Sequence, residues 1–478
     1  MKTKTLVAFV ALAVIVEVGL AEDRKLAWPQ FRGPNGSGVA DGAKPPIEIG
    51  PDKNVKWKIS VPSGLSSPIV VGDKLVITAF DDGKLFTIAY SRDTGNEVWR
   101  AAAPAKQIEA FHKIEGSPAA STPATDGERI VSYFGSCGLV CHDLSGKELW
   151  KFELPPAVLL GEFGSGVSPI IVDGVVVLVR DQKTESKIIA LDVSSGTPKW
   201  QTKRLSPVSY CTPVVWETPV GKQIVAAGHA RMFGYDFQTG VEKWSVGGIP
   251  AGNCASPVMS DGLLLFAGSS AGEEGQEDQM PSFDSLLKDL DKDKDGALSR
   301  EEAEKAFEGF FDNQDANKDG KLTRDEWDAI LKLFSEGQNS AFALKPGGTG
   351  DVTKSHVLWK QTKGLPYLTS AIAYRGQYVM IKDCGIVTSL DAETGTEVFR
   401  GRAASAGKYY ASPVAANGHI YFTSLDGTVT VLKAGSKKAE VVAENPKLDE
   451  RTAATPAIAD DTLYIRTEKH LYAFAEKS

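Results

Sequence analysis

Short apolar runs separated by polar turns recur along most of the chain. Each unit holds a Ser/Thr-Pro step, an apolar run, a turn with Gly or Asp, and a second apolar run. Short runs bounded by turn residues predict β-strands rather than helices. Proline lacks an N–H group and is tolerated at the first residue of a strand, so each step should begin the innermost strand of its unit. The eight steps are Ser67-Pro68, Thr122-Pro123, Ser168-Pro169, Thr212-Pro213, Ser256-Pro257, Ser412-Pro413, Thr455-Pro456 and the variant Ser370-Ala371.

A second signature, an Asp-containing turn that ends in Thr/Ser-Gly, follows the strand pairs in five units. A large aromatic residue stands four positions after each Gly. Glycine permits the positive φ of a tight turn, and Asp can bond its own backbone. We expect the aromatic to fill the wedge between neighbouring sheets. The pairs are Gly95 with Trp99, Gly146 with Trp150, Gly196 with Trp200, Gly240 with Trp244, and Gly395 with Phe399.

These repeats predict a mainly β fold, an eight-bladed β-propeller. Most steps are 42 to 55 residues apart, which suits one four-stranded blade per unit. The interval from Ser256 to Ser370 is 114 residues, so that unit has gained an insertion. The last unit ends at 470–475 without an aromatic outer strand, whereas an unassigned strand at 55–59 carries Trp57. We expect Trp57 to complete blade eight and close the ring, which removes exposed sheet edges.

The insertion, assigned to residues 272–338, changes to a helical period and contains two acidic twelve-residue segments. Residues 291–302 and 315–326 both match the EF-hand calcium loop, with Gly at position 6, Leu at position 8 and Glu at position 12. Calcium takes six to eight oxygens, and such a loop supplies them from positions 1, 3, 5, 7 (a backbone carbonyl), 9 and 12. The predicted ligands of two Ca²⁺ sites are Asp291, Asp293, Asp295, Ala297, Ser299 and Glu302, and Asp315, Asn317, Asp319, Lys321, Thr323 and Glu326.

The two loops should act as a pair. Gly296 and Gly320 would make the sharp bend of each loop, and Leu298 and Leu322 should form a small β-bridge between them. Only residues 303–314 separate the loops, so one helix is expected to leave the first loop and enter the second. This short linker, unlike that of calmodulin, favours structural or buffering binding over sensing. The apolar face of the linker would hold Ala306, Phe307, Phe310 and Phe311, opposite Leu287, Trp327, Ile330 and Leu331.

The repeats resemble the pyrroloquinoline-quinone-type (PQQ-type) repeat family, whose strands end in a pattern like Ala-x-Asp-x-x-Thr-Gly-x-x-x-Trp. Residues 189–200 are the closest copy, and the resemblance covers roughly 51–271 and 339–478, the two propeller parts. It implies the propeller fold. The family includes quinoprotein dehydrogenases and a non-enzymatic scaffold lipoprotein of the outer-membrane β-barrel assembly machinery. The segment from Trp28 to Gly38 is similar to the lead-in of exported bacterial members.

The N-terminus has the pattern of an export signal. Residues 1–21 combine a basic start, a short apolar run and a small-residue cleavage point. We expect cleavage near Glu22, a lead-in at 22–50, and a periplasmic or secreted product. An uncleaved anchor is the alternative, but Glu17 interrupts the apolar run well short of the roughly 20 residues that span a bilayer. No second run is long enough, so we predict no transmembrane segment in the mature chain.

The net charge and the cysteine content limit the classes of function that this protein can have. A net charge of −8 argues against a nucleic-acid partner, which requires a basic surface. The chain has 5 cysteines, too few for a disulfide framework at this length. A disulfide between Cys211 and Cys254, which begin neighbouring inner strands, stays open. The 6 histidines are scattered without metal-ligand spacing, and no nucleophile motif stands out, so we predict no catalytic residue.

One face of the propeller is the candidate binding surface. By strand parity, the insertion emerges where the innermost strands begin, near the mouth of the central channel. We predict a calcium-binding scaffold with a protein or glycan partner on this face. The alternative is a PQQ-dependent alcohol or sugar dehydrogenase, but little chain is left to build a cofactor pocket, so we expect no bound PQQ. Residues expected at this face are Tyr210, Cys211, Asn253, Cys254, Tyr367, Tyr409, Tyr410, Arg451 and Thr452, with Glu109, Phe111, His112 and Glu115 of the connection 101–120.

Overall fold

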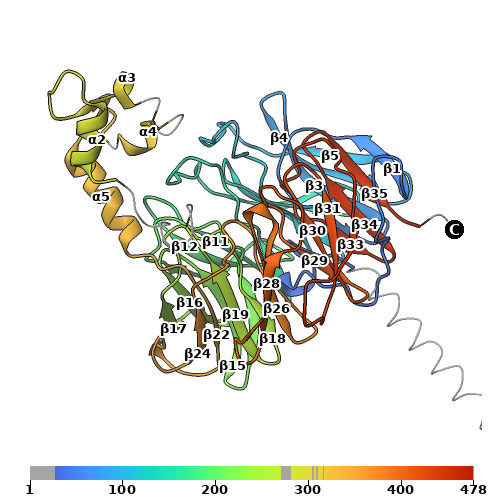
Figure 1. The fold of residues 1–478 in the computed structure, drawn as a ribbon. Coiled ribbons are helices and arrows are strands. Elements are labelled where there is room, and N and C mark those ends of the chain that lie inside the picture. The colour runs from blue at the N-terminus through green and yellow to red at the C-terminus, as the bar shows by residue number, and fades with distance from the viewer. Residues whose placement is uncertain (1–26, 271–280, 304–305, 308–310, 316, 477–478) are drawn as a thin grey trace, which may run out of the picture.

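Eight antiparallel sheets surround a central channel in the computed structural model, which describes residues 27–270, 281–303, 306–307, 311–315 and 317–476. The predicted eight-bladed β-propeller is confirmed (Figure 1). Blades one to four are β2 (Ile69–Val71), β3 (Lys74–Asp81), β4 (Lys84–Ser91), β5 (Glu97–Ala102); β6 (Ala124–Thr125), β7 (Arg129–Phe134), β8 (Gly138–Asp143), β9 (Glu148–Glu153); β10 (Ile170–Val172), β11 (Val175–Arg180), β12 (Lys187–Asp192), β13 (Pro198–Lys203); and β14 (Val214–Thr218), β15 (Gly221–Ala227), β16 (Arg231–Asp236), β17 (Glu242–Gly247).

The remaining blades follow the same order from the channel outward, with two local changes. A short strand, β23 (Gly350–Asp351), adds in parallel to β17 of blade four, and blade eight takes its outer strand from the start of the chain. Blades five to eight are β18 (Val258–Ser260), β19 (Leu263–Gly268), β22 (Ser340–Leu344), β24 (Val357–Gln361); β25 (Ile372–Tyr374), β26 (Gln377–Lys382), β27 (Ile386–Asp391), β28 (Glu397–Arg402); β29 (Val414–Ala416), β30 (His419–Thr423), β31 (Val429–Lys433), β32 (Val441–Glu444); and β33 (Ala457–Ala459), β34 (Thr462–Arg466), β35 (His470–Phe474), β1 (Val55–Ser60).

Outer tryptophans of five blades lock onto the next blade, as expected from the repeat, whereas Trp244 donates to Gln223 of its own blade. Trp150 of β9 packs against Gly196 in the turn of blade three, and its indole N–H donates to Val193 O at 2.8 Å. A Cβ atom on Gly196 would lie 2.6 Å from the indole ring, so only glycine admits this contact. The same contact joins Trp57 to Gly95, Trp99 to Gly146, Trp200 to Gly240 and Trp359 to Gly395. Trp57 reaches blade one from β1, which closes the ring as predicted.

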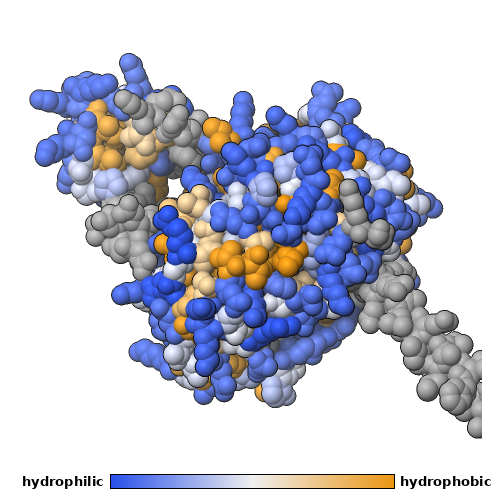
Figure 2. All heavy atoms as spheres, turned by 45° about the vertical axis from the view of Figure 1, so that its right-hand side comes forward, coloured by the Kyte–Doolittle hydropathy of each residue, from blue (hydrophilic) through white to orange (hydrophobic). Residues whose placement is uncertain are grey.

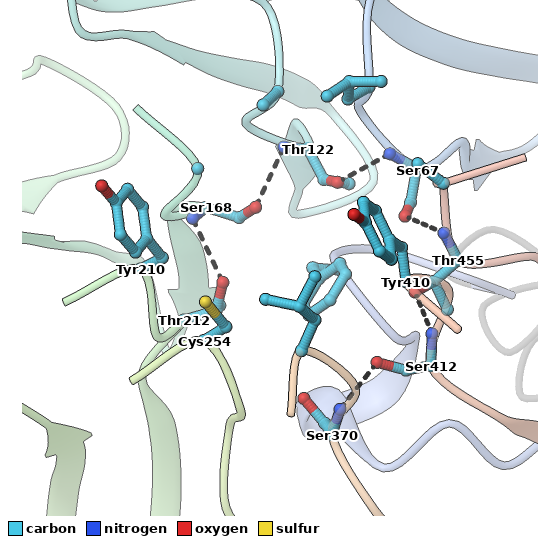
Figure 3. A pocket seen from close by; sticks show the side chains of 16 residues that line it. Ser67, Thr122, Ser168, Tyr210, Thr212, Cys254, Ser370, Tyr410, Ser412 and Thr455 are labelled. Carbon is cyan, nitrogen blue, oxygen red and sulfur yellow. Dashed lines mark hydrogen bonds between the residues drawn. The ribbon is translucent and has the colours of Figure 1, made fainter. Parts of the chain in front are cut away.

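The Ser/Thr residues of the repeat form a second set of contacts between neighbouring blades. These residues surround the channel and are here called the hydroxyl ring (Figure 3). The backbone N–H of each residue donates to the side-chain hydroxyl of its counterpart in the next blade. Seven such bonds, of 2.9 to 3.1 Å, run from Ser67 to Thr122, Thr122 to Ser168, Ser168 to Thr212, Ser256 to Ser370, Ser370 to Ser412, Ser412 to Thr455 and Thr455 to Ser67. The repeat step therefore begins a strand and also binds it to the next blade.

The lead-in at 27–50, here called the plug, lies on the inner strands on the far side of the hydroxyl ring from the mouth. In four blades, the backbone or a side chain of the plug binds the residue that stands three positions after the ring residue of that blade. Those four contacts are Trp28 with Val70, Pro29 with Thr125, Asn35 with Val215, and Val39 with Ala415. The sequence offered no role for this segment, which the structure places across the channel.

The helices lie between β19 and β22 of blade five, and Figure 1 shows them projecting from the propeller. They are α2 (Phe283–Leu290), α3 (Arg300–Ala303), α4 (Phe311–Gln314) and α5 (Arg324–Ser335). None of the helices in the described part of the chain has the length and apolarity that crossing a bilayer requires. Their core holds Phe283, Leu286, Leu298, Ala303, Phe311, Leu322 and Trp327, with Leu287, Leu290, Phe307, Ile330 and Leu331 at its edge.

The expectation of a single helix between the two acidic loops was wrong. A turn at Ala306 and Phe307 separates α3 from α4, and Ala306 is exposed rather than on an apolar face. The β-bridge holds the loops side by side, so the connecting chain must reverse direction, which a straight helix cannot do. Phe310, also assigned to that face, lies outside the described residues.

The segment after α5 anchors the helices to the propeller. Gln338 N donates to Ile249 O at 2.9 Å, and Lys360 Nζ donates to Gln338 Oε1 at 3.0 Å. On the other side, Ser269 N donates to Pro366 O at 2.8 Å. Ile249 and Pro366 belong to connections that lead to inner strands, so the helices emerge on the mouth side of the channel.

Candidate functional site

The first acidic loop gathers its carboxylates around one point. One oxygen each from Asp291, Asp293 and Glu302 lie within 4.8 Å of one another, a grouping able to hold a metal ion. Asp291 Oδ1 and Oδ2 accept from Lys294 N and Gly296 N at 2.7 and 3.1 Å. Gly296 has φ +85°, the positive value expected at the bend of the loop. The loop is thus curled with these three acidic side chains turned toward one another.

The second loop repeats this geometry. Asp315, which is 2% exposed, accepts from Asp319 N and Gly320 N at 3.2 and 2.8 Å. Glu326 Oε2 accepts from Thr323 N at 2.9 Å and from Thr323 Oγ1 at 2.7 Å. Gly320 has the same φ, +85°, as its counterpart. The two loops therefore share one conformation at corresponding positions.

The predicted pairing of the loops is confirmed. Leu298 pairs with Leu322 in a two-residue antiparallel bridge of β20 (Leu298–Ser299) with β21 (Lys321–Leu322), and both leucines are fully buried. Lys321 Nζ also meets Asp295 Oδ2 at 2.6 Å, which joins the second loop to the first.

Hydrogen bonds keep Glu302, the last acidic residue of the first loop, ionised. Ser299 donates from both its hydroxyl and its backbone N–H to Glu302 Oε2, at 2.7 and 2.9 Å. These bonds, with a further one from Lys292 N, lower the pKa of Glu302 to about 2. The ionised form of a carboxylate is the one that ligates a cation. The side-chain oxygens, with the backbone carbonyls of Ala297 and Lys321, form the donor set that Ca²⁺ prefers.

At the channel mouth, the structure divides the residues expected there into three groups. Tyr210, Cys254 and Tyr410 line a cavity that opens from the mouth into the channel, and Tyr367 is 41% exposed beside it. A second group is partly exposed and consists of Phe111, His112, Glu115 and Arg451. The others are buried and pack the loop ends, and they are Glu109, Cys211, Asn253, Tyr409 and Thr452. The Cys211–Cys254 disulfide is not formed, since both thiols are free.

The connection 101–120 crosses the mouth and is held at both ends. Glu115 accepts a hydrogen bond from Tyr410 Oη at 2.8 Å and meets Arg451 Nη2 at 3.4 Å. Arg451 Nη1 also donates to Ile114 O at 2.6 Å. These contacts tie a connection between blades one and two to the loops that lead into blades seven and eight. The connection 101–120 thus spans the mouth.

The other end of this connection rests on a buried acid. Glu109 is 3% exposed and accepts from Ser165 N at 3.1 Å and from Ser165 Oγ at 2.7 Å. Burial outweighs these hydrogen bonds and raises the pKa of Glu109 to about 7. Glu109 therefore links blades two and three, and the strength of this link depends on whether its carboxyl group is protonated.

The mouth side also carries exposed apolar side chains. Each belongs to a connection from an outer strand to the next inner strand, and those connections all emerge on this side. The exposed fractions are 70% for Ile114, 49% for Val158, 92% for Leu205 and 41% for Tyr367. Figure 2 shows apolar atoms interrupting a largely hydrophilic surface on the propeller and on the insertion. Apolar groups exposed around one opening favour a binding surface, although Val220 and Val241 are 69% and 55% exposed on turns elsewhere.

The cavity itself has a volume of about 160 Å³. Figure 3 shows ring hydroxyls around it, with Tyr210 and Tyr410 among them. In the described part of the chain, its wall contains no Lys, Arg, Asp or Glu side chain. The lining residues are Phe31, Leu65, Ser67, Ala120, Thr122, Gly166, Ser168, Tyr210, Thr212, Cys254, Leu368, Ser370, Tyr410, Ser412, Ala453 and Thr455.

Together, the fold and these sites define an eight-bladed propeller built from PQQ-type repeats, with paired acidic loops beside its mouth. Residues 86–273 and 350–477, well over half of the chain, match the model of the family described as "Outer membrane protein assembly factor BamB". The chain belongs to this family. The resemblance inferred from the repeats is thereby confirmed.

One relative and one solved structure with the same name are similar to this chain. A protein named outer membrane protein assembly factor BamB, from Burkholderia pseudomallei (strain K96243), is 24% identical over 276 residues, which are 48% of this chain and 67% of the relative. The crystal structure of BamB from Moraxella catarrhalis has a TM-score of 0.52 at 14% identity, covering 88% of this chain and 97% of that one.

Quinoprotein enzymes share the fold too. A europium-containing methanol dehydrogenase has a TM-score of 0.59 at 10% identity and covers 94% of this chain and 98% of its own. The quinohemoprotein alcohol dehydrogenase from Comamonas testosteroni has a TM-score of 0.53 at 13% identity, covering 95% and 82%. At such identities the likeness shows the fold alone.

Proposed function

We propose that this protein is an exported, calcium-binding propeller that acts as a binding or assembly scaffold, with a partner protein on its mouth side. The observation that carries the calcium part is the convergence of Asp291, Asp293 and Glu302 oxygens within 4.8 Å. The second loop, from Asp315 to Glu326, repeats the conformation of the first. Two loops with the same curl and the same oxygen order are explained most simply by a pair of calcium sites.

The available oxygens match the requirement of the ion. In the first loop, three Asp side chains, the carbonyl of Ala297 and both oxygens of Glu302 supply six ligands, and Ser299 or a water completes the shell. The second loop differs by Asn317 in place of an Asp, which lowers its negative charge by one. Outside the cytosol, sites with dissociation constants of about 10⁻⁴ to 10⁻³ M are sufficient. Export rests on the signal-like residues 1–21, which lie outside the described residues.

The scaffold part rests on the mouth side. Ile114 and Leu205 expose aliphatic surface there, which suits a protein partner better than a glycan, since sugars stack on flat aromatic rings. The relatives' name, an assembly factor, supports the same class of function. The calcium loops emerge on this side. An ordered helical insertion would therefore enlarge the surface to which the partner binds.

A quinoprotein function is supported less well by the channel. The cavity of about 160 Å³ is smaller than the roughly 300 to 1,000 Å³ of typical cofactor pockets. PQQ carries three carboxylates, whose combined charge requires several cationic partners, and among the described residues no Lys or Arg side chain lines this cavity. The residues of the cavity therefore do not fit PQQ, and we derive no reaction through it.

Calorimetry tests the calcium assignment. The full-length mature protein, titrated with Ca²⁺, should take up two ions, whereas the variant with Asp291→Ala and Asp315→Ala should take up none. A matched variant, Asp284→Ala and Asp328→Ala, removes two acids of α2 and α5 outside the loops and should bind as the wild type does. Equal heats from the wild type and the loop variant would reject the assignment. Dye reduction after incubation with PQQ tests the enzyme alternative, and turnover would replace the scaffold proposal.

A further inference from the structure

The hydroxyl ring leaves hydrogens without acceptors inside the channel. A hydroxyl oxygen that accepts an N–H still carries its own hydrogen, which needs an acceptor when it is buried. Seven ring residues line the cavity, and each is at most 4% exposed. Within the described part of the chain, each of their oxygens accepts a backbone N–H, and none donates to a protein acceptor. One cavity, which opens at the mouth, is thus walled by O–H donors.

A buried positive charge lies next to this space. Arg32 of the plug is 0% exposed, and its Nη2 donates to Ala371 O at 2.7 Å. Ala371 stands one position after the ring residue Ser370, and Phe31, the residue before Arg32, lines the cavity itself. The guanidinium of Arg32 therefore lies beside the ring without lining the cavity. Its Nε and Nη1 have no hydrogen-bond partner among the described residues.

Arg466 provides a comparison within the same protein. It is also buried, with 1% exposure, and burial lowers the pKa of both arginines to about 10. Arg466 Nη1 donates to Ser66 O, Ser66 Oγ and Thr78 O, and its Nη2 donates to Pro62 O, at 2.6 to 3.1 Å. Four oxygens thus bind the guanidinium of Arg466, whose Nε alone lacks a partner among the described residues, whereas Arg32 has one carbonyl. A buried charge with so few partners is costly, and an anion is its natural complement.

The backbone supports a specific role for Arg32. Its φ of +60° lies in the left-handed region, which costs a non-glycine residue roughly 1 kcal/mol or more. The following Gly33 packs against Trp28, where a Cβ atom would lie 2.7 Å from the indole ring. The plug therefore holds Arg32 in an unfavourable conformation that presents its side chain to blade six beside the ring.

We propose that the central cavity binds a small inorganic anion of the halide class, held by the hydroxyl ring and balanced by Arg32. The cavity of about 160 Å³ admits such an ion with a few waters. Convergent O–H donors favour an anion over a cation, and the nearest acids do not oppose it. Glu115 is paired with Arg451, and Glu109 has its pKa raised to about 7. This site is separate from the calcium loops and independent of the proposed function.

Bromide locates the ion directly. Crystals of the calcium-saturated wild-type protein soaked in sodium bromide should show an anomalous difference peak inside the hydroxyl ring. Ordered water alone at this position, with bromide elsewhere on the surface, would overturn the proposal. This measurement needs no variant, so it tests anion binding in the hydroxyl ring even if a substitution prevents folding.

Thermal unfolding tests the role of Arg32. At equal ionic strength and saturating calcium, replacing gluconate by chloride should raise the wild-type melting temperature by about 2 °C or more. Arg32→Met should lose this chloride response. The matched variant Arg466→Met, which removes a buried arginine already surrounded by oxygens, should be less stable but keep it. A full response in Arg32→Met would contradict the proposal, as would loss of the response in both variants.

Discussion

Gly196→Ala is expected to weaken the contact between blades two and three. The added Cβ atom would lie 2.6 Å from the indole ring of Trp150, well inside van der Waals distance. Trp150 is 8% exposed and its N–H is bonded to Val193 O, so the ring has little room to move. The substitution must therefore shift either the turn or the tryptophan.

A matched substitution separates this clash from backbone strain. Gly174, in the same blade, has φ +72° against +70° for Gly196, but a Cβ atom there meets nothing within 4 Å. Left-handed strain costs about 1 to 2 kcal/mol at either position. Overpacking against Trp150 adds about 1 to 3 kcal/mol at Gly196 alone. We expect Gly196→Ala to lose about 2 to 5 kcal/mol and Gly174→Ala about 1 to 2 kcal/mol.

Urea unfolding followed by far-ultraviolet circular dichroism measures both variants against the wild type. The signal reports the sheets and is not dominated by the one tryptophan that moves. If both variants lose the same stability, the tryptophan contact has no energetic role and the account of how blades are joined is wrong.

Two further predictions concern the mouth. The pKa of Glu109 rises from an ordinary 4.5 to about 7 on folding, so the unfolded chain loses this proton first and stability should fall as pH rises from about 4.5 to 7. Glu109→Gln should remove this component, roughly 3 kcal/mol at most, and identical pH profiles of urea unfolding would contradict it. Arg451→Leu should release Ile114 and Glu115 and speed amide exchange of residues 110–116 about tenfold, whereas unchanged exchange would show that Arg451 does not hold the connection.

Repetition made most of the fold predictable from the sequence. The Ser/Thr-Pro steps marked the inner strands, and Trp57 identified the strand that closes the ring. The tryptophan contacts follow from the same pattern, because every blade needs the same wedge filled. A Trp and its Gly partner belong to successive units, however, so the sequence motif alone did not show that Trp150 binds Gly196 rather than the turn of its own blade.

Features without repetition were predicted poorly. The plug contacts four blades through single residues such as Trp28 and Asn35, and no local pattern announces partners that are 42 to 376 residues away. The linker between the loops failed for a related reason, because its helical period says nothing about the reversal imposed by the Leu298–Leu322 bridge. Burial also removed Cys211 and Tyr409 from the expected mouth surface, since both occupy space between blades.

Terbium luminescence is the most direct test of the central claim, that the two acidic loops bind metal ions. Trp327 follows Glu326 and is buried beneath the loops, so its excitation should sensitise a bound Tb³⁺ ion. The account predicts emission that reaches a plateau at two equivalents, that calcium displaces, and that is lost in a variant with Glu302→Gln and Glu326→Gln. The same emission from that variant, or no sensitised emission from the wild type, would contradict it.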